Sequence, residues 1–292
     1  SQCNCAYWHG VYGGLYLPHL RRALYAQMIE ADRLLLSTDD PSSAAAASGP
    51  AGTVRRDQVD YDADGLPETI VRGPSAAFWL RRRGGALVGW DLRRNRINLL
   101  NTLARHPEMY HDAPVAEPEP EAEGGEQKTI HDIVRTLTPQ QKEALVYDWH
   151  DRVSGLDHFY AELAPASAHR LGRVHDEGDF VLGLYDDRSA EADNEPASTA
   201  SSGTLSSPTI VRFRRTGGIF RDGSVATIVL TKTWSLDPAS GGFRLVVELR
   251  RIDDNLAPLQ TWYAPEFNFG LFAGDDPTRR TTGPPPTEDL RP

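Results

Sequence analysis

The chain has 292 residues, of which 39% are hydrophobic and 25% charged, a composition typical of a globular protein with enough length for a sizeable core. Its formal net charge is −10, and its arginines are scattered along the sequence, which argues against nucleic acid and anionic membranes as partners. No apolar run reaches the roughly 20 residues of a membrane-spanning helix, and the first residues lack the pattern of a signal peptide.

The only cysteines are Cys3 and Cys5. Two residues apart, they are poorly placed to bridge each other, and no further Cys or His follows at metal-ligand spacing. The simplest interpretation is two ordinary thiols in a reducing compartment, so the sequence predicts a cytoplasmic location.

The first predicted element is a helix over 16–36. Pro18 suits a first helical turn, and apolar residues then recur every three to four positions, at Leu20, Leu24, Met28, Ala31 and Leu35. The helix runs into a small-residue linker over 37–53. Two acidic, Pro-containing insertions over 113–128 and 186–208 and a Pro- and Thr-rich tail over 273–292 are predicted to be disordered.

The remaining segments read mostly as short β-strands bounded by Gly, Pro or Asp. They are 54–61, 68–73, 76–82, 86–92, 209–215, 225–236, 243–252 and 260–272, the last broken at Pro265. A hairpin through the sequence DPASGG joins two of them. Thr138 and Pro139 are suited to the start of a helix within 138–153. The fold class is therefore mainly β: an antiparallel β-sandwich preceded by a short helical segment.

An acidic loop, DYDADGLPE, places carboxylates at Asp60, Asp62, Asp64 and Glu68. Alternating acids followed by a glycine can turn their oxygens inward around a hard cation, so these four residues are the predicted ligands of a structural calcium ion. The alternative is an acidic hairpin turn without an ion, because Asp and Gly are turn residues in any case. No organic cofactor is predicted.

Two further groups of polar residues could carry chemistry. The segment 147–160 concentrates acids and histidines, which could form a base with its orienting partner, or an ion-pair network of Arg152 with Asp148 or Asp157. Its other members are His150, Asp151 and His158. The segment 175–180 groups Asp176, Glu177 and Asp179, for which a solvated turn is favoured over a glycosidase-type carboxylate pair.

The opening segment, QCNCAYWHG, combines aromatic faces with planar polar groups, which is what a sugar ring and its hydroxyls require. The residues concerned are Gln2, Asn4, Tyr7, Trp8 and His9. From composition alone, a loop packed into a core is an equal alternative.

The stretch SQCNCAYWHGVYGGLYLPHLRR resembles the last conserved motif of the α-amylase and 4-α-glucanotransferase branch of glycoside hydrolase family 57. Further segments resemble the same family in the same order, among them VDYDADGLPETIVR, LLNTLARHPEMYHD, LVYDWHDRVSGLDHFY and EGDFVLGLYD. The resemblance runs from Ser1 to about Asn268. It departs from the family at Cys5, where an Asp is usual, so the resemblance implies that one polar contact of the family's sugar pocket is missing or altered here.

The resemblance implies that the chain is the C-terminal part of a retaining enzyme acting on α-1,4-glucans and maltooligosaccharides. Residues 1–36 would then end the catalytic domain, and 54–272 would form a β-sandwich similar to galactose-mutarotase-like folds that packs on the enzyme's own catalytic barrel. The Glu nucleophile and the Asp acid/base are expected upstream, so no catalytic residue is assigned and the chain alone is predicted to be inactive. Trp8 would line the pocket near a bound glucose unit, with His9 and Asn4 nearby.

Two other functions remain open at this level. One is a free-standing carbohydrate-binding module, whose sugar affinity would depend on Trp8. The other is an independent mutarotase-like enzyme that uses His158 or His175.

Overall fold

The computed structural model describes residues 16–37, 54–112, 138–143, 145–193, 208–253 and 258–270. The chain divides into two compact units. The larger comprises Ser1–Thr102, Arg152–Glu162 and Asp176–Pro292, and the smaller comprises Leu103–Asp151 and Leu163–His175. The sequence predicts a single β domain over 54–272, whereas the structure interrupts that range with the smaller unit at two places.

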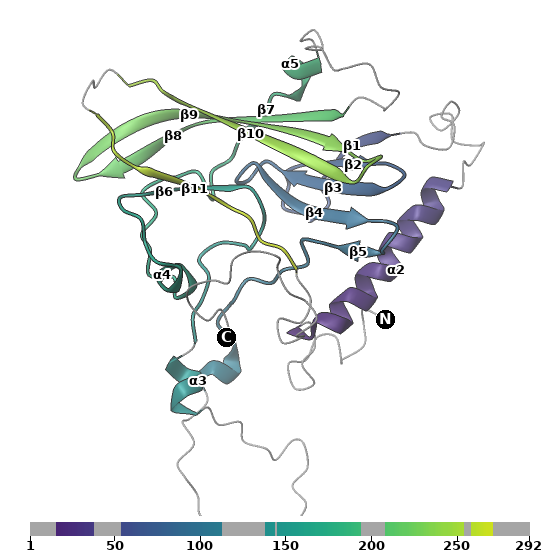
Figure 1. The fold of residues 1–292 in the computed structure, drawn as a ribbon, viewed down its shortest axis with the longest axis horizontal. Coiled ribbons are helices and arrows are strands. Elements are labelled where there is room, and N and C mark those ends of the chain that lie inside the picture. Colours follow the sequence, from purple (N-terminus) through teal and green to yellow (C-terminus); the bar gives the residue numbers. More distant parts are fainter. Residues whose placement is uncertain are drawn as a thin grey trace, which may run out of the picture. The chain divides into compact units, whose positions relative to one another are not determined.

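The first sheet of the larger unit is a five-stranded antiparallel meander (Figure 1). Its strands are β1 (Arg55–Val59), β2 (Glu68–Arg72), β3 (Ala76–Arg81), β4 (Ala86–Leu92) and β5 (Ile97–Asn98). The first four confirm the predicted strands, because each is a run of β-forming residues that ends at a turn residue. β5 is too short to be visible in the sequence. It is fixed partly through Asn98, whose side chain donates a hydrogen bond to Asp91 Oδ1 at 2.8 Å.

The second sheet has four antiparallel strands in the order β10-β9-β8-β7. Their bounds are β7 (Asp186–Asp187), β8 (Thr209–Arg221), β9 (Ser224–Asp237) and β10 (Gly242–Arg251). The predicted hairpin between β9 and β10 is confirmed. β8 extends beyond the predicted 209–215 and includes Gly217, a residue type that usually ends a strand. A Cβ atom at Gly217 would lie 2.3 Å from the Asp179 side chain and 2.8 Å from Phe180, so a glycine is needed for this close packing.

A third, two-stranded sheet pairs β6 (Leu156–Tyr160) with β11 (Trp262–Glu266). Pro265 was expected to break the last strand, but it lies within β11 opposite Asp157. A proline is tolerated there because β11 has a partner on one side only. β6 itself was not predicted as a strand.

The two large sheets share one hydrophobic core, which confirms the predicted antiparallel β-sandwich. The first sheet contributes Val71, Phe78 and Leu80, and the second contributes Phe213 and Trp234, all without solvent exposure. Figure 1 shows these two sheets as the blue and green layers of the larger unit.

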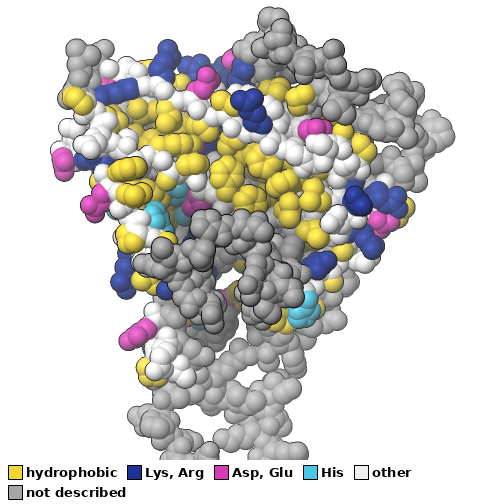
Figure 2. Space-filling view, viewed as in Figure 1, with side chains coloured by type: hydrophobic (Ala, Val, Ile, Leu, Met, Phe, Trp, Pro, Cys, Tyr) yellow, Lys and Arg dark blue, Asp and Glu magenta, His cyan; other side chains and the backbone are white. Residues whose placement is uncertain are grey.

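Two aromatic side chains that follow β11 are partly exposed to solvent. The rings of Phe267 and Phe269 stack with their centroids 6.3 Å apart, and these side chains are 37% and 42% exposed. Trp90 lies 6.4 Å from Phe269 and packs against the core. Figure 2 shows hydrophobic side chains gathered at the surface of the face that it draws.

Helix α2 (Pro18–Ser37) confirms the predicted helix but not its buried face. Ile29 is the buried residue, at 1% exposure. The second half of the predicted apolar stripe is in solvent, with Met28 38% exposed and Leu35 73%, whereas Leu20 and Leu24 are half-buried. Among the described helices, none combines the length and the apolar composition needed to cross a membrane.

The smaller unit contains three short helical elements among its described residues: η3 (Met109–Asp112), α3 (Pro139–Glu143) and α4 (Ala166–Arg170). The helix predicted within 138–153 therefore ends at Glu143.

The predicted insertion over 186–208 is wrong at its start. Residues 186–193 form β7 and a short helix, α5 (Ser189–Asp193). Asp187 Oδ1 accepts the main-chain N–H of Ser189 at 2.9 Å, which fixes the turn between these two elements. The rest of that insertion, the linker from 38, the insertion over 113–128 and the tail over 273–292 lie outside the described residues.

Candidate functional site

The five residues predicted to contact sugar lie outside the described residues. They are Gln2, Asn4, Tyr7, Trp8 and His9. What the structure describes is the helix that follows them, α2, and its attachment to the sandwich.

Asp32 joins α2 to the first sheet through two arginines. Its Oδ2 atom lies 2.7 Å from Arg93 Nη2, and its Oδ1 atom lies 3.2 Å from Arg72 Nε. The Arg93 side chain is only 4% exposed, and its Nε atom also donates to the carbonyl of Gly73 at 2.7 Å. Ion pairs of this kind, desolvated on the arginine side, hold the helix in one orientation.

Near the start of the helix, Arg21 Nε donates a hydrogen bond to Asn101 Oδ1 at 2.8 Å. Asn101 is buried and follows β5. The segment that leads out of the predicted sugar-binding motif is therefore tied to the sandwich at both ends of α2.

The acidic loop connects β1 and β2. Ala63 and Gly65 have φ angles of 61° and 87°, which turn the chain tightly. Main-chain amides bind the loop's own carboxylates: Asp62 Oδ1 accepts the N–H of Asp64 at 3.1 Å, and Asp60 Oδ2 accepts the N–H of Gly65 at 3.1 Å. The carboxylates are therefore held within the loop.

Three of the four predicted calcium ligands converge. Asp60, Asp62 and Glu68 each offer one oxygen, and these oxygens lie within 4.8 Å of one another. Because calcium–oxygen distances are about 2.3–2.6 Å, ligands across one ion are up to about 5 Å apart, so this group fits the ion. Asp64 is not part of the group, and its Oδ1 atom instead accepts the N–H of Leu66 at 2.8 Å.

Glu68 is the buried member of this group, at 3% exposure. Burial raises the pKa of its carboxyl group, and the negative charges of Asp62 and Asp64 add to the increase, against hydrogen bonds from the main chain. A bound cation would offset both the burial and the like charges.

The polar segment 147–160 does not form one site. Asp148 belongs to the smaller unit, where Arg105 binds it through its side chain and its main-chain N–H, the latter at 2.8 Å. Asp157 belongs to the larger unit and does not pair with Arg152 as predicted. Arg152 Nη1 instead lies 3.6 Å from Glu266 Oε1.

Asp157 is the centre of a buried network that the sequence did not reveal. It lies 2.5 Å from Lys232 Nζ, and it accepts hydrogen bonds from the hydroxyl groups of Tyr185 and Tyr263, both at 2.8 Å. Lys232 is 0% exposed and Asp157 1%. Burial lowers the pKa of Lys232, while Asp157 opposes that shift.

His158 is held between two carboxylates. Its Nδ1 atom lies 2.9 Å from Asp176 Oδ2, and its Nε2 atom lies 2.8 Å from Glu266 Oε2. Burial by itself lowers the pKa of His158, but the hydrogen bonds and charges of the two carboxylates outweigh it and raise the pKa to about 9. The two carboxylates therefore favour the protonated ring at neutral pH, and both ring nitrogens are engaged in hydrogen bonds.

The segment 175–180 is not the solvated turn that its composition favoured. Glu177 is 8% exposed and forms an ion pair with Arg221. Asp179 lies 2.8 Å from Arg215 Nη2, and Asp176 also accepts the N–H of Gly178 at 2.9 Å. Each carboxylate therefore has a structural partner, and the turn fastens β6 and β8.

Family models of two consecutive domains match the chain. The model described as Alpha-amylase/4-alpha-glucanotransferase, middle domain, matches residues 1–35. The model described as Alpha-amylase/4-alpha-glucanotransferase, C-terminal, matches residues 60–284. Residues 36–59, which include β1, lie between the two matches.

Individual proteins agree with these models. The 4-alpha-glucanotransferases of Thermococcus kodakarensis and Thermococcus litoralis are 36% and 34% identical over 188 residues, which is 63% and 64% of this chain and 26% of each relative. Alpha-amylase 1 of Dictyoglomus thermophilum is 36% identical over 155 residues, or 53% of this chain and 20% of the relative. The chain thus matches about a quarter of the length of these relatives or less.

The fold is shared with a solved structure. The crystal structure of 4-alpha-glucanotransferase from Thermococcus litoralis superposes with a TM-score of 0.67 and 24% sequence identity, over 92% of this chain and 34% of that one.

Proposed function

Because the chain belongs to the alpha-amylase/4-alpha-glucanotransferase family, we propose that it is the C-terminal part of an enzyme that processes α-1,4-glucans by a retaining mechanism. The observation that carries this proposal is the order of the two family matches, with the end of a middle domain at 1–35 followed by a C-terminal domain at 60–284. The relatives are named 4-alpha-glucanotransferase or alpha-amylase, so both transfer to a sugar and transfer to water are consistent with it.

In this proposal the opening motif supplies one wall of the sugar-binding site. Trp8 offers a flat face for the C–H groups of a glucose unit, and Asn4 and His9 bind its hydroxyls. The catalytic nucleophile and acid/base belong to the catalytic barrel of the same enzyme, so the chain by itself has no turnover.

The exposed face of α2 supports docking on that barrel. The later members of its predicted apolar stripe, Met28, Ala31 and Leu35, are exposed, whereas Ile29 is buried. Met28 and Leu35 leave 38% and 73% of their surface in solvent. An apolar helix stripe in solvent is typical of a surface that another domain covers.

A chimeric enzyme tests the proposal. The 292-residue chain would replace the matching segment of the Thermococcus kodakarensis 4-alpha-glucanotransferase, and disproportionation of maltotriose would be measured. We expect an active chimera in which Trp8→Ala lowers kcat/KM about 100-fold, because a sugar that loses its platform is misplaced at the reacting bond. Trp8→Phe, which keeps a flat ring, is the matched control and should lose less than about tenfold.

Turnover by the isolated chain would contradict the proposal, as would a chimera whose activity does not respond to Trp8→Ala. Maltooligosaccharide binding by the isolated chain that is lost in Trp8→Ala, in combination with an inactive chimera, would favour the stand-alone binding module. For His158 the mutarotase-like alternative is not favoured, because both of its ring nitrogens are occupied by carboxylates. His175 lies at an exposed position of the smaller unit, and its role in that alternative stays a prediction.

We further propose that Asp60, Asp62 and Glu68 bind one structural calcium ion between β1 and β2. At a calcium concentration one hundred times Kd, binding would stabilise the chain by about 2.7 kcal/mol. Thermal unfolding monitored by circular dichroism should therefore shift upward by several degrees when calcium is added after chelation.

The variants follow from the geometry of the loop. Asp62→Asn should abolish the calcium-dependent shift, whereas Asp64→Asn should retain most of it, because Asp64 lies outside the convergent group. Equal shifts in the wild type and in Asp62→Asn would rule out this site. The cytoplasmic location stays a prediction from the two cysteines.

A further inference from the structure

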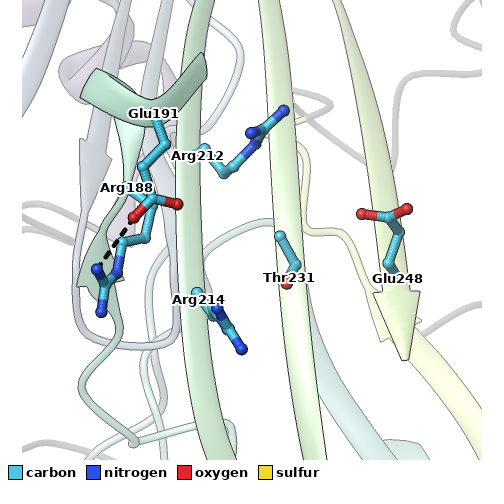
Figure 3. Close-up of a pocket in the computed structure, with 6 residues that line it drawn as sticks. All are labelled: Arg188, Glu191, Arg212, Arg214, Thr231 and Glu248. Carbon is cyan, nitrogen blue, oxygen red and sulfur yellow. Dashed lines mark hydrogen bonds and ion pairs between the residues drawn. The ribbon is translucent and has the colours of Figure 1, made fainter. Parts of the chain in front are cut away.

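A second candidate for sugar binding lies on the outer face of the four-stranded sheet. It is a pocket of about 340 Å³ between the start of α5 and strand β10, with β8 and β9 as its floor (Figure 3). Its size is near the lower end for small-molecule sites. The lining residues are Arg188, Glu191, Arg212, Arg214, Thr231 and Glu248.

The floor of this outer-face pocket is set by strand register. Arg212 and Arg214 are alternate residues of β8 and share one face of the sheet. Arg214 pairs with Thr231 of β9, and Thr231 pairs with Glu248 of β10. A guanidinium, a hydroxyl and a carboxylate therefore stand in a row across three strands, about 4.8 Å apart from strand to strand.

The wall formed by α5 is also fixed. The main-chain N–H of Arg188 donates to the carbonyl of Arg212 at 2.7 Å, and Ser189 Oγ accepts the N–H of Arg212 at 3.1 Å. The Arg188 guanidinium is neutralised by Glu191, at 3.0 Å. Figure 3 shows this ion pair beside the two arginines of β8.

The row on the floor keeps its polar groups available. Among the described residues, the side chains of Arg214, Thr231 and Glu248 have no hydrogen bond or ion pair with any neighbour. A site on strands with unused donors and acceptors is ready for a ligand, because the sheet holds the groups in place before binding.

The charge of the pocket indicates the chemistry of that ligand. Three guanidinium groups face two carboxylates, which leaves a net charge of only +1. Glu248 at the end of the row would repel a phosphate or carboxylate, and the arginines would repel a cation. A sugar satisfies both kinds of group, because its oxygens accept from guanidinium and its hydroxyls donate to carboxylate.

Further hydroxyl groups lie on the same face of the four-stranded sheet, beyond the pocket. Thr233 and Ser235 follow Thr231 at alternate positions of β9, and Arg212 Nε lies 3.4 Å from Thr233 Oγ1. A ligand longer than the pocket could therefore extend along β9.

We propose that the outer-face pocket is an auxiliary binding site for a neutral α-1,4-glucan chain, separate from the sugar contacts of the opening motif. The nature of the sugar rests on the proposed function. The presence of a polyol site rests on the row of Arg214, Thr231 and Glu248. Such a site would hold a long glucan on the enzyme between catalytic events, by raising its effective concentration.

Ligand-observed saturation-transfer NMR of the 292-residue chain with maltoheptaose tests this inference. We expect binding that is about tenfold weaker in Arg214→Met, which keeps the aliphatic stem and removes one charge-assisted hydrogen bond. Thr231→Val, nearly equal in volume, should weaken binding less than Arg214→Met. The matched control is Arg250→Met, an exposed arginine two residues beyond Glu248 that does not line the pocket.

Three outcomes would overturn the inference. The first is an absence of maltoheptaose binding by the folded wild-type chain. The second is binding that is unchanged in Arg214→Met and Thr231→Val but lost in Trp8→Ala, which would place the sugar on the opening motif. The third is displacement of maltoheptaose by inorganic phosphate, which would make the pocket an anion site.

The chimera assay separates this inference from the proposed function. An inactive chimera with retained maltoheptaose binding by the chain would overturn the proposed function alone. An active chimera in which the chain binds no maltoheptaose would overturn the auxiliary site alone.

Discussion

Replacement of Lys232 by methionine is expected to lower the free energy of unfolding by about 3–5 kcal/mol, the largest single effect anticipated for this chain. The ammonium group of Lys232 is fully buried, lies 2.5 Å from Asp157 Oδ2 and donates to the carbonyl of Gly84 at 2.6 Å. Methionine has a similar volume and removes the charge, so the cost comes from leaving Asp157 buried without a cation.

The carbonyls around Lys232 add to this cost. The carbonyl of Gly84 accepts from Lys232. Position 84 requires a glycine, because its φ is +71° and a Cβ atom there would lie 2.7 Å from Leu156 and 2.8 Å from the carbonyl oxygen of Val181. The carbonyl of Gly155 also accepts from Lys232. Both glycine carbonyls would lose a charged donor inside the core.

Urea unfolding at pH 7, followed by circular dichroism, measures the effect. Lys142→Met, on the exposed surface of α3, is the control and should change stability by less than about 0.5 kcal/mol. The double variant Lys232→Met/Asp157→Asn should regain part of the loss, because the uncompensated charge is removed with its partner. A loss below about 1 kcal/mol in Lys232→Met would contradict the role assigned to this ion pair.

The position of Lys232 could have been recognised from the sequence. In the strand VATIVLTKTWSL, the alternate residues Ala226, Ile228, Leu230, Trp234 and Leu236 are all buried in the core. Lys232 falls on the same phase, so the period of two already places a lysine inside the sandwich. Its partner could not be predicted, because Asp157 lies 75 residues earlier, on a strand that lacks an alternating pattern.

For helix α2, by contrast, the buried face could not be predicted from the sequence. Its existence follows from Pro18 and from the spacing of its apolar residues, but the spacing predicts the wrong buried face. The orientation is set by Asp32, which contacts Arg72 and Arg93 across the first sheet. Since these arginines are distant in sequence, only the tertiary structure shows that an ionic contact outweighs the apolar stripe.

The candidate sites were predictable to different degrees, because some are built from neighbouring residues and others from residues that are distant in sequence. The acidic loop is local, within nine residues, so its turn and three of its four ligands could be predicted. The row of Arg214, Thr231 and Glu248 depends on register between three strands, which a hairpin length sets only in part. The carboxylates that hold His158 come from positions 176 and 266, and nothing local to His158 indicates them.

Increasing the pH should weaken this chain through His158, by about 3 kcal/mol in total. The pKa of His158 is raised from about 6.5 in the unfolded chain to about 9 in the folded protein. A raised pKa means that folding binds a proton, so the stabilisation is fully present below about pH 6.5 and is lost as the pH rises through 9. The imidazolium stabilises because Asp176 and Glu266 bind its two nitrogens, and Tyr160 stacks on the ring at 5.6 Å.

The free energy of unfolding would be measured at pH 6 and at pH 9.5 for the wild type and for His158→Gln. The glutamine cannot gain a proton, so the decrease between the two values should be about 3 kcal/mol smaller in the variant than in the wild type. His19→Gln, at an exposed position of α2, is the control and should keep the wild-type decrease. An equal decrease in the free energy of unfolding for His158→Gln and the wild type would contradict this role. The contacts of the His158 ring with Asp176 and Glu266 would then not stabilise the folded chain through its charge. A confirmed difference would also mean that the ring is charged throughout the neutral range, and it would exclude His158 as a general base.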